Sequence, residues 1–314
     1  MIESQSHTET WLTIVNPNAG TKKGEKDWHK IAKRLRKEEI PFSEFFTREK
    51  GHAIEMTLEN IRKGFRKFLV VGGDGTLNEV VNGLFLQNEI PPSEFILAMI
   101  PVGTGNDWCR SFEIPFSYKK AIRLVKKGNS RLQDVGKIEY YMADTSKSRY
   151  FVNVAGMGYD AIVAAKTNKD KARGRGGPLV YMKNLLTSLM FYKHTQTVIL
   201  IDDQSPVHHK TFSLSVGIGK YNGGGMMQLP DAVVDDGIFN ITLIKKLSKF
   251  TVVRQVKNLY DGSFINHPKV ETFSGRKIQV QSDPPISLEA DGESLGHSPF
   301  TFEIIQKGLR VIAG

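Results

Sequence analysis

Cysteine is almost absent from this chain: Cys109 is the single one among 314 residues. One cysteine excludes an internal disulfide framework and fits a reducing compartment. Any apolar run of the ~18 residues that a membrane-spanning helix requires is also absent. The start, MIESQSHTETW, lacks the apolar segment of a secretory signal. We therefore expect a cytoplasmic protein that reaches a membrane only from its inner surface, as a peripheral protein.

Several common catalytic motifs are missing as well. Nothing near the glycine-rich stretch VVGGDGTLNE (70–79) reads G-K-[ST], so the lysine of the common nucleotide-binding loop is absent. The histidines have no zinc-ligand spacing, and no CxxC or Ser-His-Asp arrangement is apparent. These absences argue against zinc, dithiol and serine-hydrolase chemistry.

Acidic residues are the minority charge. Lysine and arginine number 43 against 33 aspartates and glutamates, which gives a net charge of +10. Such a surface suits nucleic acid, anionic lipid or a polyphosphate substrate. No nucleic-acid recognition motif accompanies the charge, so we expect no nucleic-acid partner.

The N-terminal part of the chain alternates short apolar runs with helical patterns. Strands are expected in residues 11–15, 42–47, 67–72 and 95–101, with helices at 24–39, 53–64 and 77–85 between them. This alternation predicts a doubly wound parallel α/β sheet, covered by helices on both faces. Ligands of such sheets gather at the carboxyl ends of the strands.

From about residue 132 the pattern changes to strand-like runs separated by turn residues. It predicts an antiparallel all-β domain, a β-sandwich of two packed sheets. One clear helical insertion is expected at Leu179–Tyr192. The closing run KGLRVIAG (307–314) fits a last strand of either domain.

The stretch 70–79 places a carboxylate, Asp74, inside a glycine-rich turn. Glycines at such positions let backbone amides approach a ligand. Thr76 and Glu79 have the spacing of a capping box, so a helix with an anion-binding N-terminus is expected to follow. Asp74 can bond the loop's own amides, accept from a ribose hydroxyl, or hold Mg²⁺ against phosphate oxygens. A tight turn without a ligand is the structural alternative.

Two further polar loops follow expected strands: NPNAG (16–20) and GTGND (103–107). Each by itself is typical of an ordinary turn, because Asn, Asp, Gly and Pro dominate turns. The three loops are expected to converge at one sheet edge, and this convergence is stronger evidence for a site than any single loop.

Six motifs in order, NPNAG, GGDGTLNEVVNG, GTGNDWCR, NVAGMGYDA, PDAVVDDGIFNI and EADGE, resemble the bacterial diacylglycerol kinase family of lipid kinases. That family is related to sphingosine kinases and, more distantly, to NAD kinases. The resemblance implies an α/β nucleotide-binding domain, residues 1–131 with 305–314, and a β-sandwich lipid-substrate domain, residues 132–304. It also implies a nucleotide cleft between the two.

The same resemblance implies the site residues, with ATP and Mg²⁺ as cofactors. The nucleotide-binding residues would be Asn16, Pro17, Asn18, Ala19, Gly20, Thr47, Gly72, Gly73, Asp74, Gly75, Thr76, Leu77, Asn78, Thr104 and Asn106. Asp74 and Asp107 would lie beside the phosphates and Mg²⁺ as catalytic residues.

The resemblance also assigns a base and a second metal site. Asp-Gly in EADGESL is a hairpin signal, and the glutamate after such a turn is usually solvated. The resemblance makes this residue, Glu293, the general base toward a lipid hydroxyl. A structural Mg²⁺ would be held by Asp236 and the carbonyls of Val233 and Ile238. Asp134 would join through water.

Membrane contact and the identity of the substrate stay open. The basic segment 166–175 and the helix after it suit an anionic membrane surface, or else a solvated loop and a helix packed on the sandwich. The expected reaction is diacylglycerol to phosphatidic acid. A sphingoid base, a monoacylglycerol, a polyprenol, an NAD-kinase-like reaction or a non-catalytic nucleotide- or lipid-binding regulator are the alternatives. The resemblance also suggests a homodimer.

Overall fold

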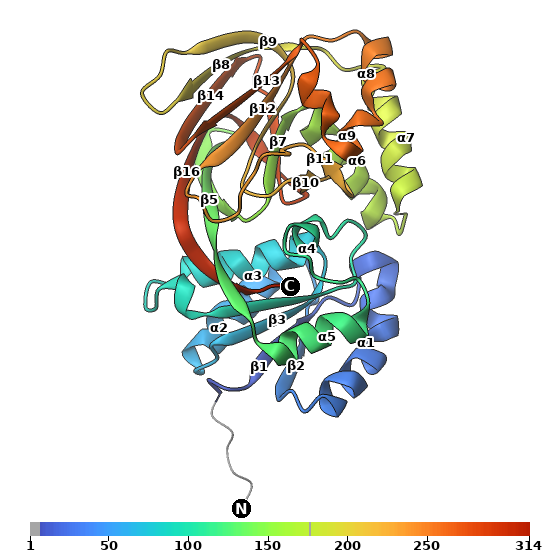
Figure 1. Cartoon of the computed structure of the whole chain (residues 1–314), viewed down its shortest axis with the longest axis vertical. Helices are drawn as coiled ribbons and strands as arrows, with labels where there is room; N and C mark the ends of the chain where they lie inside the picture. The colour runs from blue at the N-terminus through green and yellow to red at the C-terminus, as the bar shows by residue number, and fades with distance from the viewer. Residues whose placement is uncertain (1–6, 176) are drawn as a thin grey trace, which may run out of the picture. The chain divides into compact units, whose positions relative to one another are not determined.

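The computed structural model describes residues 7–175 and 177–314 (Figure 1). The first six residues of the polar start therefore lie outside the described residues. The chain forms two compact units: residues 1–133 with 307–314, and residues 134–306. They are called unit 1 and unit 2 below.

Unit 1 contains a parallel sheet of four short strands. These are β1 (Trp11–Val15), β2 (Phe42–Phe46), β3 (Lys67–Gly72) and β4 (Ile96–Pro101), in the order β2-β1-β3-β4. The end of the long strand β16 (Glu293–Ile312) pairs beside β4, with Arg310 opposite Ile96. All five residues of β1 are buried, as expected for a strand covered on both faces.

Helices cover both faces of this sheet. They are α1 (Ala19–Lys37), α2 (His52–Arg62), α3 (Asp74–Leu86), the short α4 (Asp107–Ser111) and α5 (Tyr118–Lys127), with a 3₁₀ turn at Pro92–Glu94. Helices α2 and α3 pack against each other, and α1 packs against α5, on the opposite side of the strands (Figure 1). The doubly wound α/β fold predicted for this part of the chain is confirmed.

The capping box expected at Thr76 and Glu79 is wrong. Helix α3 already begins at Asp74, and no side chain caps its N-terminus. The Glu79 carboxylate instead accepts hydrogen bonds from the Gly51 amide (2.8 Å) and the Ala53 amide (3.2 Å). Glu79 therefore binds unpaired amides at the start of α2, because α2 packs along α3 and brings them within reach.

Unit 2 is rich in β-structure. Its strands are β5 (Ser130–Met142, entering from unit 1), β6 (Thr145–Phe151), β7 (Val154–Gly158), β8 (Thr195–Ile201), β9 (Val207–Gly217), β12 (Phe239–Lys245), β13 (Val270–Gly275), β14 (Lys277–Asp283), β15 (Ser287–Ala290) and most of β16, with a separate ribbon of β10 (Tyr221–Asn222) and β11 (Met226–Met227). The pairing runs β7-β9-β8-β14-β16-β15 and returns to β7. The expected sheets are therefore joined, because the long strands β9 and β16 continue from one into the other.

Unit 2 has more helix than the sequence indicates. Its helices are α6 (Tyr159–Ala172), α7 (Pro178–Leu189), α8 (Lys249–Gln255) and α9 (Asn258–Asp261), with a 3₁₀ turn at Ser263–Asn266. The sequence pattern predicts only α7. Much of the basic segment 166–175 belongs to α6, so the alternative of a solvated loop there is wrong. No helix in the described parts of the chain is long and apolar enough to cross a membrane.

Candidate functional site

The strand order of unit 1 indicates where a ligand can bind. The chain moves from β1 outward to β2, then returns past β1 to β3. The connections after β1 and after β3 therefore leave the sheet in opposite directions, which opens a crevice at their carboxyl ends. The loops at that crevice are NPNAG and GGDGT, and the loop after β4 is GTGND.

These three loops touch one another. The Asn16 side-chain amide donates to the Thr76 hydroxyl at 2.8 Å, and the Asn16 backbone amide donates to the Val71 carbonyl at 2.9 Å. A Cβ atom added at Gly103 would lie 2.6 Å from the Gly73 Cα atom. The convergence expected from the sequence is thus present in the structure.

The first loop follows an unusual path. Gly20, Thr21 and Lys22 all have positive φ, at 59°, 58° and 67°, inside the span of α1. This left-handed turn brings Gly20 so close to the Val102 carbonyl that a methyl group at residue 20 would overlap it. Only glycine fits there, because both the backbone angle and the close approach exclude a side chain.

Two carboxylates meet beside these loops. A Cβ atom added at Gly105 would lie 3.2 Å from an Asp107 oxygen and 3.3 Å from an Asp74 oxygen. The other Asp74 oxygen accepts from the Trp108 amide at 3.2 Å, and Asp107 pairs with Arg110 at 3.4 Å. Carboxylate oxygens are the donors that Mg²⁺ prefers, so this donor set fits a divalent cation.

A polar pocket with a cavity volume of about 260 Å³ lies against the GTGND loop. Its lining includes Thr104 and Asn106, which the sequence analysis predicts, and also Lys23, Arg110 and Tyr118, which it does not. Lys23 follows the left-handed turn of α1, and Arg110 lies on α4. The site thus has two cations suited to phosphate although the G-K-[ST] lysine is absent.

The remaining expected nucleotide-binding residues lie at the same sheet edge, but not all have side chains that a ligand could reach. Thr47 follows β2, and its amide donates to the Val15 carbonyl at 2.9 Å. Leu77 and Asn78 are 1% and 0% exposed inside α3, so their side chains shape the site by packing. The loop residues Pro17, Asn18 and Ala19 and the glycines Gly72 and Gly75 lie within the converging loops.

In unit 2, Glu293 follows a rigid hairpin turn. Asp291 and Gly292 have φ of 49° and 81°, which are typical of Asp-Gly turns, and β15 pairs with β16 across them. The buried Asp291 carboxylate accepts from the Val152 and Asn153 amides at 2.9 and 3.0 Å. The turn is therefore anchored to the segment before β7.

The same turn is held from two more sides. The Asn168 side chain on α6 donates to the Gly292 carbonyl at 2.9 Å. The Glu289 carboxylate accepts from the Gly292 amide at 3.0 Å. A glutamate on such a turn has little freedom to move, which is the condition a positioned base requires.

The proposed structural-metal loop of unit 2 folds against Asp134. The fully buried Asp134 accepts from the Gly237 amide at 2.6 Å, and its own amide donates to the Val234 carbonyl at 2.8 Å. Asp236 accepts from the Ile238 amide at 3.0 Å. Among the described residues no three His, Cys, Asp or Glu side chains gather as metal ligands. The expected donors here are one carboxylate with the carbonyls of Val233 and Ile238, which are oxygens that suit Mg²⁺.

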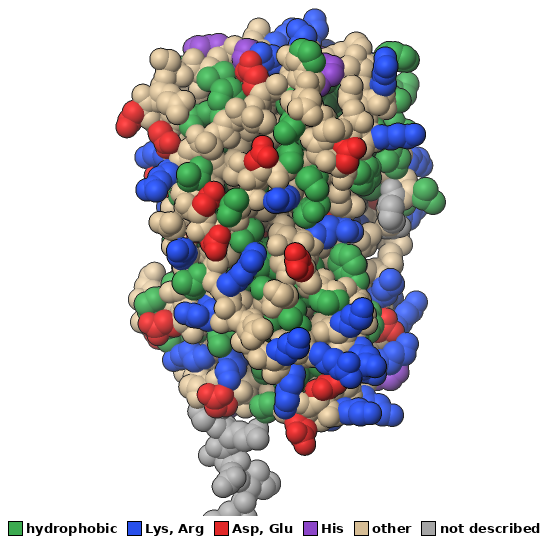
Figure 2. Space-filling model, viewed as in Figure 1, with side chains coloured by type: hydrophobic (Ala, Val, Ile, Leu, Met, Phe, Trp, Pro, Cys, Tyr) green, Lys and Arg blue, Asp and Glu red, His purple; other side chains and the backbone are tan. Residues whose placement is uncertain are grey.

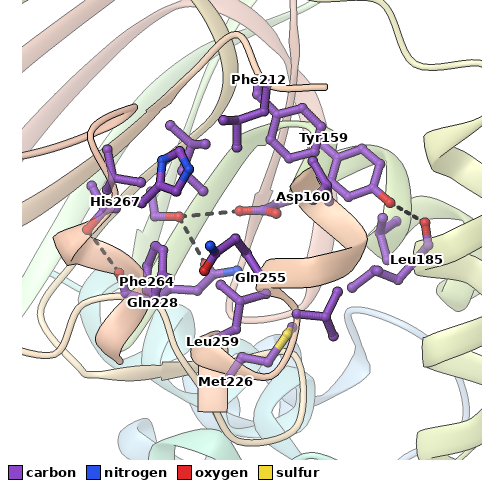
Figure 3. Close-up of a pocket in the computed structure, with 18 of the residues that line it drawn as sticks. Tyr159, Asp160, Leu185, Phe212, Met226, Gln228, Gln255, Leu259, Phe264 and His267 are labelled. Atoms are coloured by element: carbon purple, nitrogen blue, oxygen red, sulfur yellow. Dashed lines mark hydrogen bonds between the residues drawn. The ribbon is translucent and has the colours of Figure 1, made fainter. Parts of the chain in front are cut away.

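A second pocket, with a cavity volume of about 60 Å³, lies inside unit 2 between the sheet and its helices (Figure 3). Its walls are mostly apolar. They include Val163 of α6, Leu185 of α7, Phe212 of β9, Val252 of α8 and Leu259 of α9. The pattern of apolar residues did not reveal this pocket, because its lining comes from elements far apart in sequence.

The floor of this apolar pocket is polar. Ser215 donates to the Asp160 carboxylate at 3.3 Å and to the Gln228 side chain at 2.9 Å (Figure 3). Asn222 donates to Gln228 at 3.5 Å and to Glu289 at 2.7 Å. One chain of hydrogen bonds thus connects the pocket to the carboxylate that holds the Gly292 amide.

Burial changes the protonation of both acids in this network. It raises the pKa of Asp160 to about 6, although hydrogen bonds from Ser213, Ser215 and Gln228 lower it. It raises the pKa of Glu289 to about 8, and the nearby Asp160 charge contributes in the same direction. Near neutral pH the network therefore holds a protonated Glu289 and a largely ionised Asp160.

Comparison with known proteins gives consistent matches. Residues 10–138 match the diacylglycerol kinase catalytic domain, and residues 153–313 match the YegS C-terminal NAD kinase beta sandwich-like domain. YtlR of Bacillus subtilis (strain 168), provisionally named a lipid kinase, is 28% identical over 96% of this chain and 98% of its own. A diacylglycerol kinase of Staphylococcus carnosus (strain TM300) is 27% identical over 95% and 93%.

Solved structures agree with the sequence matches. A crystal structure of a provisionally named diacylglycerol kinase from Bacillus anthracis str. Sterne superimposes with a TM-score of 0.76. It is 26% identical and covers 98% of this chain and 97% of its own. The similarity therefore spans both units.

Proposed function

Because this chain belongs to the lipid kinase family that joins a diacylglycerol kinase catalytic domain to a YegS-type C-terminal domain, we propose that its substrate is a diacylglycerol. The reaction would transfer the γ-phosphoryl group of ATP to the free lipid hydroxyl, giving phosphatidic acid and ADP. The proposed place of action is the cytoplasmic surface of a membrane, where such a lipid is found.

The nucleotide would bind at the three converging loops of unit 1. Lys23 and Arg110, which line the pocket beside residues 103–105, would offer positive charge and hydrogen bonds to phosphates, and the start of α3 at residues 73–75 would add backbone amides. Asp74 and Asp107 would hold Mg²⁺, which when bound neutralises charge on the phosphate oxygens. In unit 2, Asp236 and the neighbouring carbonyls would hold a second, structural ion.

The apolar pocket of unit 2 is the observation that carries the lipid assignment. A pocket with walls such as Val163, Leu185 and Phe212 offers an acyl chain a dry environment. The polar groups of NAD would find no hydrogen-bond partners on those walls. At its polar end, the Gln228 amide could donate to an ester oxygen of a glycerolipid and the Asp160 carboxylate could accept from its hydroxyl.

Glu293 would act as the general base. Its carboxylate would accept the proton of the lipid hydroxyl while that oxygen forms the new bond to the γ-phosphorus. The bond from that phosphorus to the bridging oxygen breaks, and ADP leaves. The hydrogen bonds that Asp291, Glu289 and Asn168 make around the turn would hold the base in place.

A phosphorylation assay across a lipid panel tests this function. Labelled ATP is supplied with mixed micelles of diacylglycerol, monoacylglycerol, a sphingoid base or a polyprenol, and separately with NAD. We expect labelled phosphatidic acid as the main product. Labelling of NAD and of no lipid would refute the proposal, and preference for another lipid alcohol would correct the substrate.

The Glu293→Gln variant separates an enzyme from a binding protein. A general base contributes ~100- to 10,000-fold, so turnover should fall by that order while ATP binding stays unchanged. Glu303→Gln, which removes an exposed carboxylate from the same strand, is the matched control and should keep wild-type turnover. Equal activity of the two variants would exclude Glu293 as the base.

A further inference from the structure

An exposed apolar surface lies on the helices that cover the unit 2 pocket. Its members are Leu179, Leu186 and Met190 on α7 and at its end, the following Phe191, and Phe250 and Val253 on α8; they are called the α7–α8 face below. We propose that the α7–α8 face inserts into an anionic lipid bilayer, so that the pocket behind it opens onto the membrane. The proposal deepens the lipid kinase function proposed above and rests on it.

The exposed apolar side chains share one side of each helix, and the two helices meet at their ends. Leu179, Leu186 and Met190 recur at helical spacing along one stripe of α7. Phe250 and Val253 are three residues apart on α8, so they share a face of that helix. The Lys249 ammonium donates to the Met190 carbonyl, which joins the end of α7 to the start of α8.

Exposure on this face is unusually high. Phe191 is 84% exposed, Phe250 is 78% and Leu179 is 87%. Single exposed apolar residues are ordinary, but neighbouring large ones on two adjacent helices mark an interaction surface. In the part of the chain that the structure describes, no other pair of phenylalanines is exposed to this degree.

The opposite sides of the same helices line the apolar pocket. Tyr181 and Leu185 of α7 and Val252 and Val256 around α8 all belong to its wall. Each helix is thus apolar toward both the pocket and the outside. A lipid that leaves the bilayer at this surface would exchange one apolar environment for another without crossing water.

The charges around the face indicate which partner fits. Residues 179–194 contain two lysines and no acid, and residues 244–260 contain Lys245, Lys246, Lys249, Arg254 and Lys257 and no acid. Nearby acids are engaged: Asp261 accepts from the Ser263 amide, Asp170 from the Asn184 side chain, and Glu271 pairs with Lys245. Figure 2 shows basic side chains among the apolar ones along this edge of unit 2.

This combination matches a membrane better than a protein partner. Apolar tips surrounded by lysine and arginine suit acyl chains below a layer of anionic headgroups. A second copy of this chain would instead bring the same excess of lysine and arginine against this one. The lipid source is therefore the bilayer.

The test measures binding of the full chain to vesicles, so it needs no catalysis. Vesicles of phosphatidylcholine with phosphatidylglycerol, and of phosphatidylcholine alone, are sedimented with wild type, with Phe191→Ser/Phe250→Ser and with Met142→Ser. Met142, the last residue of β5, is 51% exposed on the same unit and belongs to neither helix, so it is the matched control. Since each buried phenylalanine contributes about tenfold or more, the double variant should bind at least roughly tenfold more weakly, and the control like wild type.

Two further variants sharpen the design. Arg254→Gln/Lys257→Gln should lose binding to phosphatidylglycerol vesicles by roughly fivefold per charge, with little change on phosphatidylcholine. The fluorescence of Phe250→Trp should be quenched by bilayers with brominated acyl chains, whereas that of Met142→Trp should not. The native tryptophans Trp11, Trp28 and Trp108 are all buried in unit 1, so they supply a constant background.

Three results would overturn the proposal. One is equal vesicle binding by the double variant and wild type. Another is fluorescence quenching of the Met142→Trp variant as strong as that of the Phe250→Trp variant on the same bilayers. The third is a wild-type dimer that the double variant abolishes while vesicle binding persists, which would assign the face to a second copy.

The two hypotheses fail in different ways. Vesicle binding that depends on Phe191 and Phe250, without phosphorylation of any lipid, would support the α7–α8 face and refute the kinase function. Phosphorylation of short-chain diacylglycerol dissolved as monomers should be unchanged in the double variant, because neither phenylalanine lines the pocket. Melting temperatures of all variants verify that each is folded.

Discussion

Asp74 lies where a negative side chain is least expected, at the first turn of a helix that follows a glycine-rich loop. One of its oxygens accepts from the Trp108 amide, and the other lies beside Gly105, as an Asp107 oxygen also does. Paired carboxylates beside a pocket that contains Lys23 and Arg110 suit a cation placed between acids and phosphates. If Asp74 served only to order the loop, its hydrogen bond from the Trp108 amide would be sufficient.

The variants Asp74→Ala and Asp74→Asn distinguish these two roles. If Asp74 holds Mg²⁺, both should lower kcat/KM by ~100-fold or more, because both remove the charge. If it only orders the loop, asparagine should restore most of the activity, since its side-chain oxygen still accepts from Trp108. Steady-state kinetics over a range of Mg²⁺ and ATP concentrations give the answer, and rescue by asparagine would contradict the metal role.

The sequence indicates some residues of the site and conceals others for a physical reason. The loops NPNAG, GGDGT and GTGND can be recognised in the sequence because glycine and short polar side chains cluster at strand ends. Lys23, Arg110, Asn222 and Glu289 have no such local signature. They reach their places only through a left-handed turn, a short helix, or strand pairs formed over long separations.

At the scale of elements, short sequence motifs predict structure reliably where a turn requires a particular backbone conformation. Asp-Gly at 291–292 predicts a hairpin, and the structure forms one. Helices α6, α8 and α9 escape prediction because they lack long apolar periodicity. Packing stabilises them instead, as when Val163 and Val252 enter the core cluster with Leu185.

The close approach of NPNAG to the loop after β4 gives a prediction about Gly20. Gly20→Ala should destabilise unit 1 and raise the KM for ATP, because the new methyl group overlaps the Val102 carbonyl. Gly128→Ala is a matched control, since Gly128 also has a positive φ of 72° but has nothing within 4 Å of its added Cβ. Thermal unfolding should show a loss of ~1 kcal/mol for the control and clearly more for Gly20→Ala.

Equal losses of unfolding free energy in the two variants would show that NPNAG and the loop after β4 can move apart to admit the methyl group. The KM for ATP discriminates further, because only Gly20 belongs to the converging loops. A change of KM in the Gly128 variant would contradict this account.

At the scale of the whole molecule, the fold class follows from the order of strands and helices, but the closed pairing of unit 2 does not. That path joins β7 to β15, which are more than a hundred residues apart in the chain. The register of such pairs depends on tertiary packing, which no local pattern encodes. The buried network at Glu289 is a product of this closure, since Asn222 and Gly292 come from separate parts of the chain.

This network makes stability depend on pH. Glu289 is 1% exposed, and its pKa rises from an ordinary 4.5 to about 8 in the folded protein. The folded chain therefore keeps a proton that the unfolded chain has already released. That contribution is fully present below about pH 4.5 and is lost as the pH rises toward 8. The free energy of unfolding should accordingly decrease across this range, by an amount on the order of a few kcal/mol.

Glu289→Gln tests the assignment, because glutamine resembles the neutral, protonated glutamic acid in shape and cannot titrate. Melting temperatures between about pH 5 and about pH 8 should fall for the wild type and much less for this variant, so the two differ most at the alkaline end. Glu303→Gln, at an exposed position of β16, should follow the wild-type curve. If the melting temperature of Glu289→Gln falls as steeply with pH as that of the wild type, Glu289 is ionised in the folded protein. The pH dependence then comes from other groups. Asp160→Asn, with a pKa of about 6 at the replaced acid, should then be measured, and it should flatten only the acidic part of the curve.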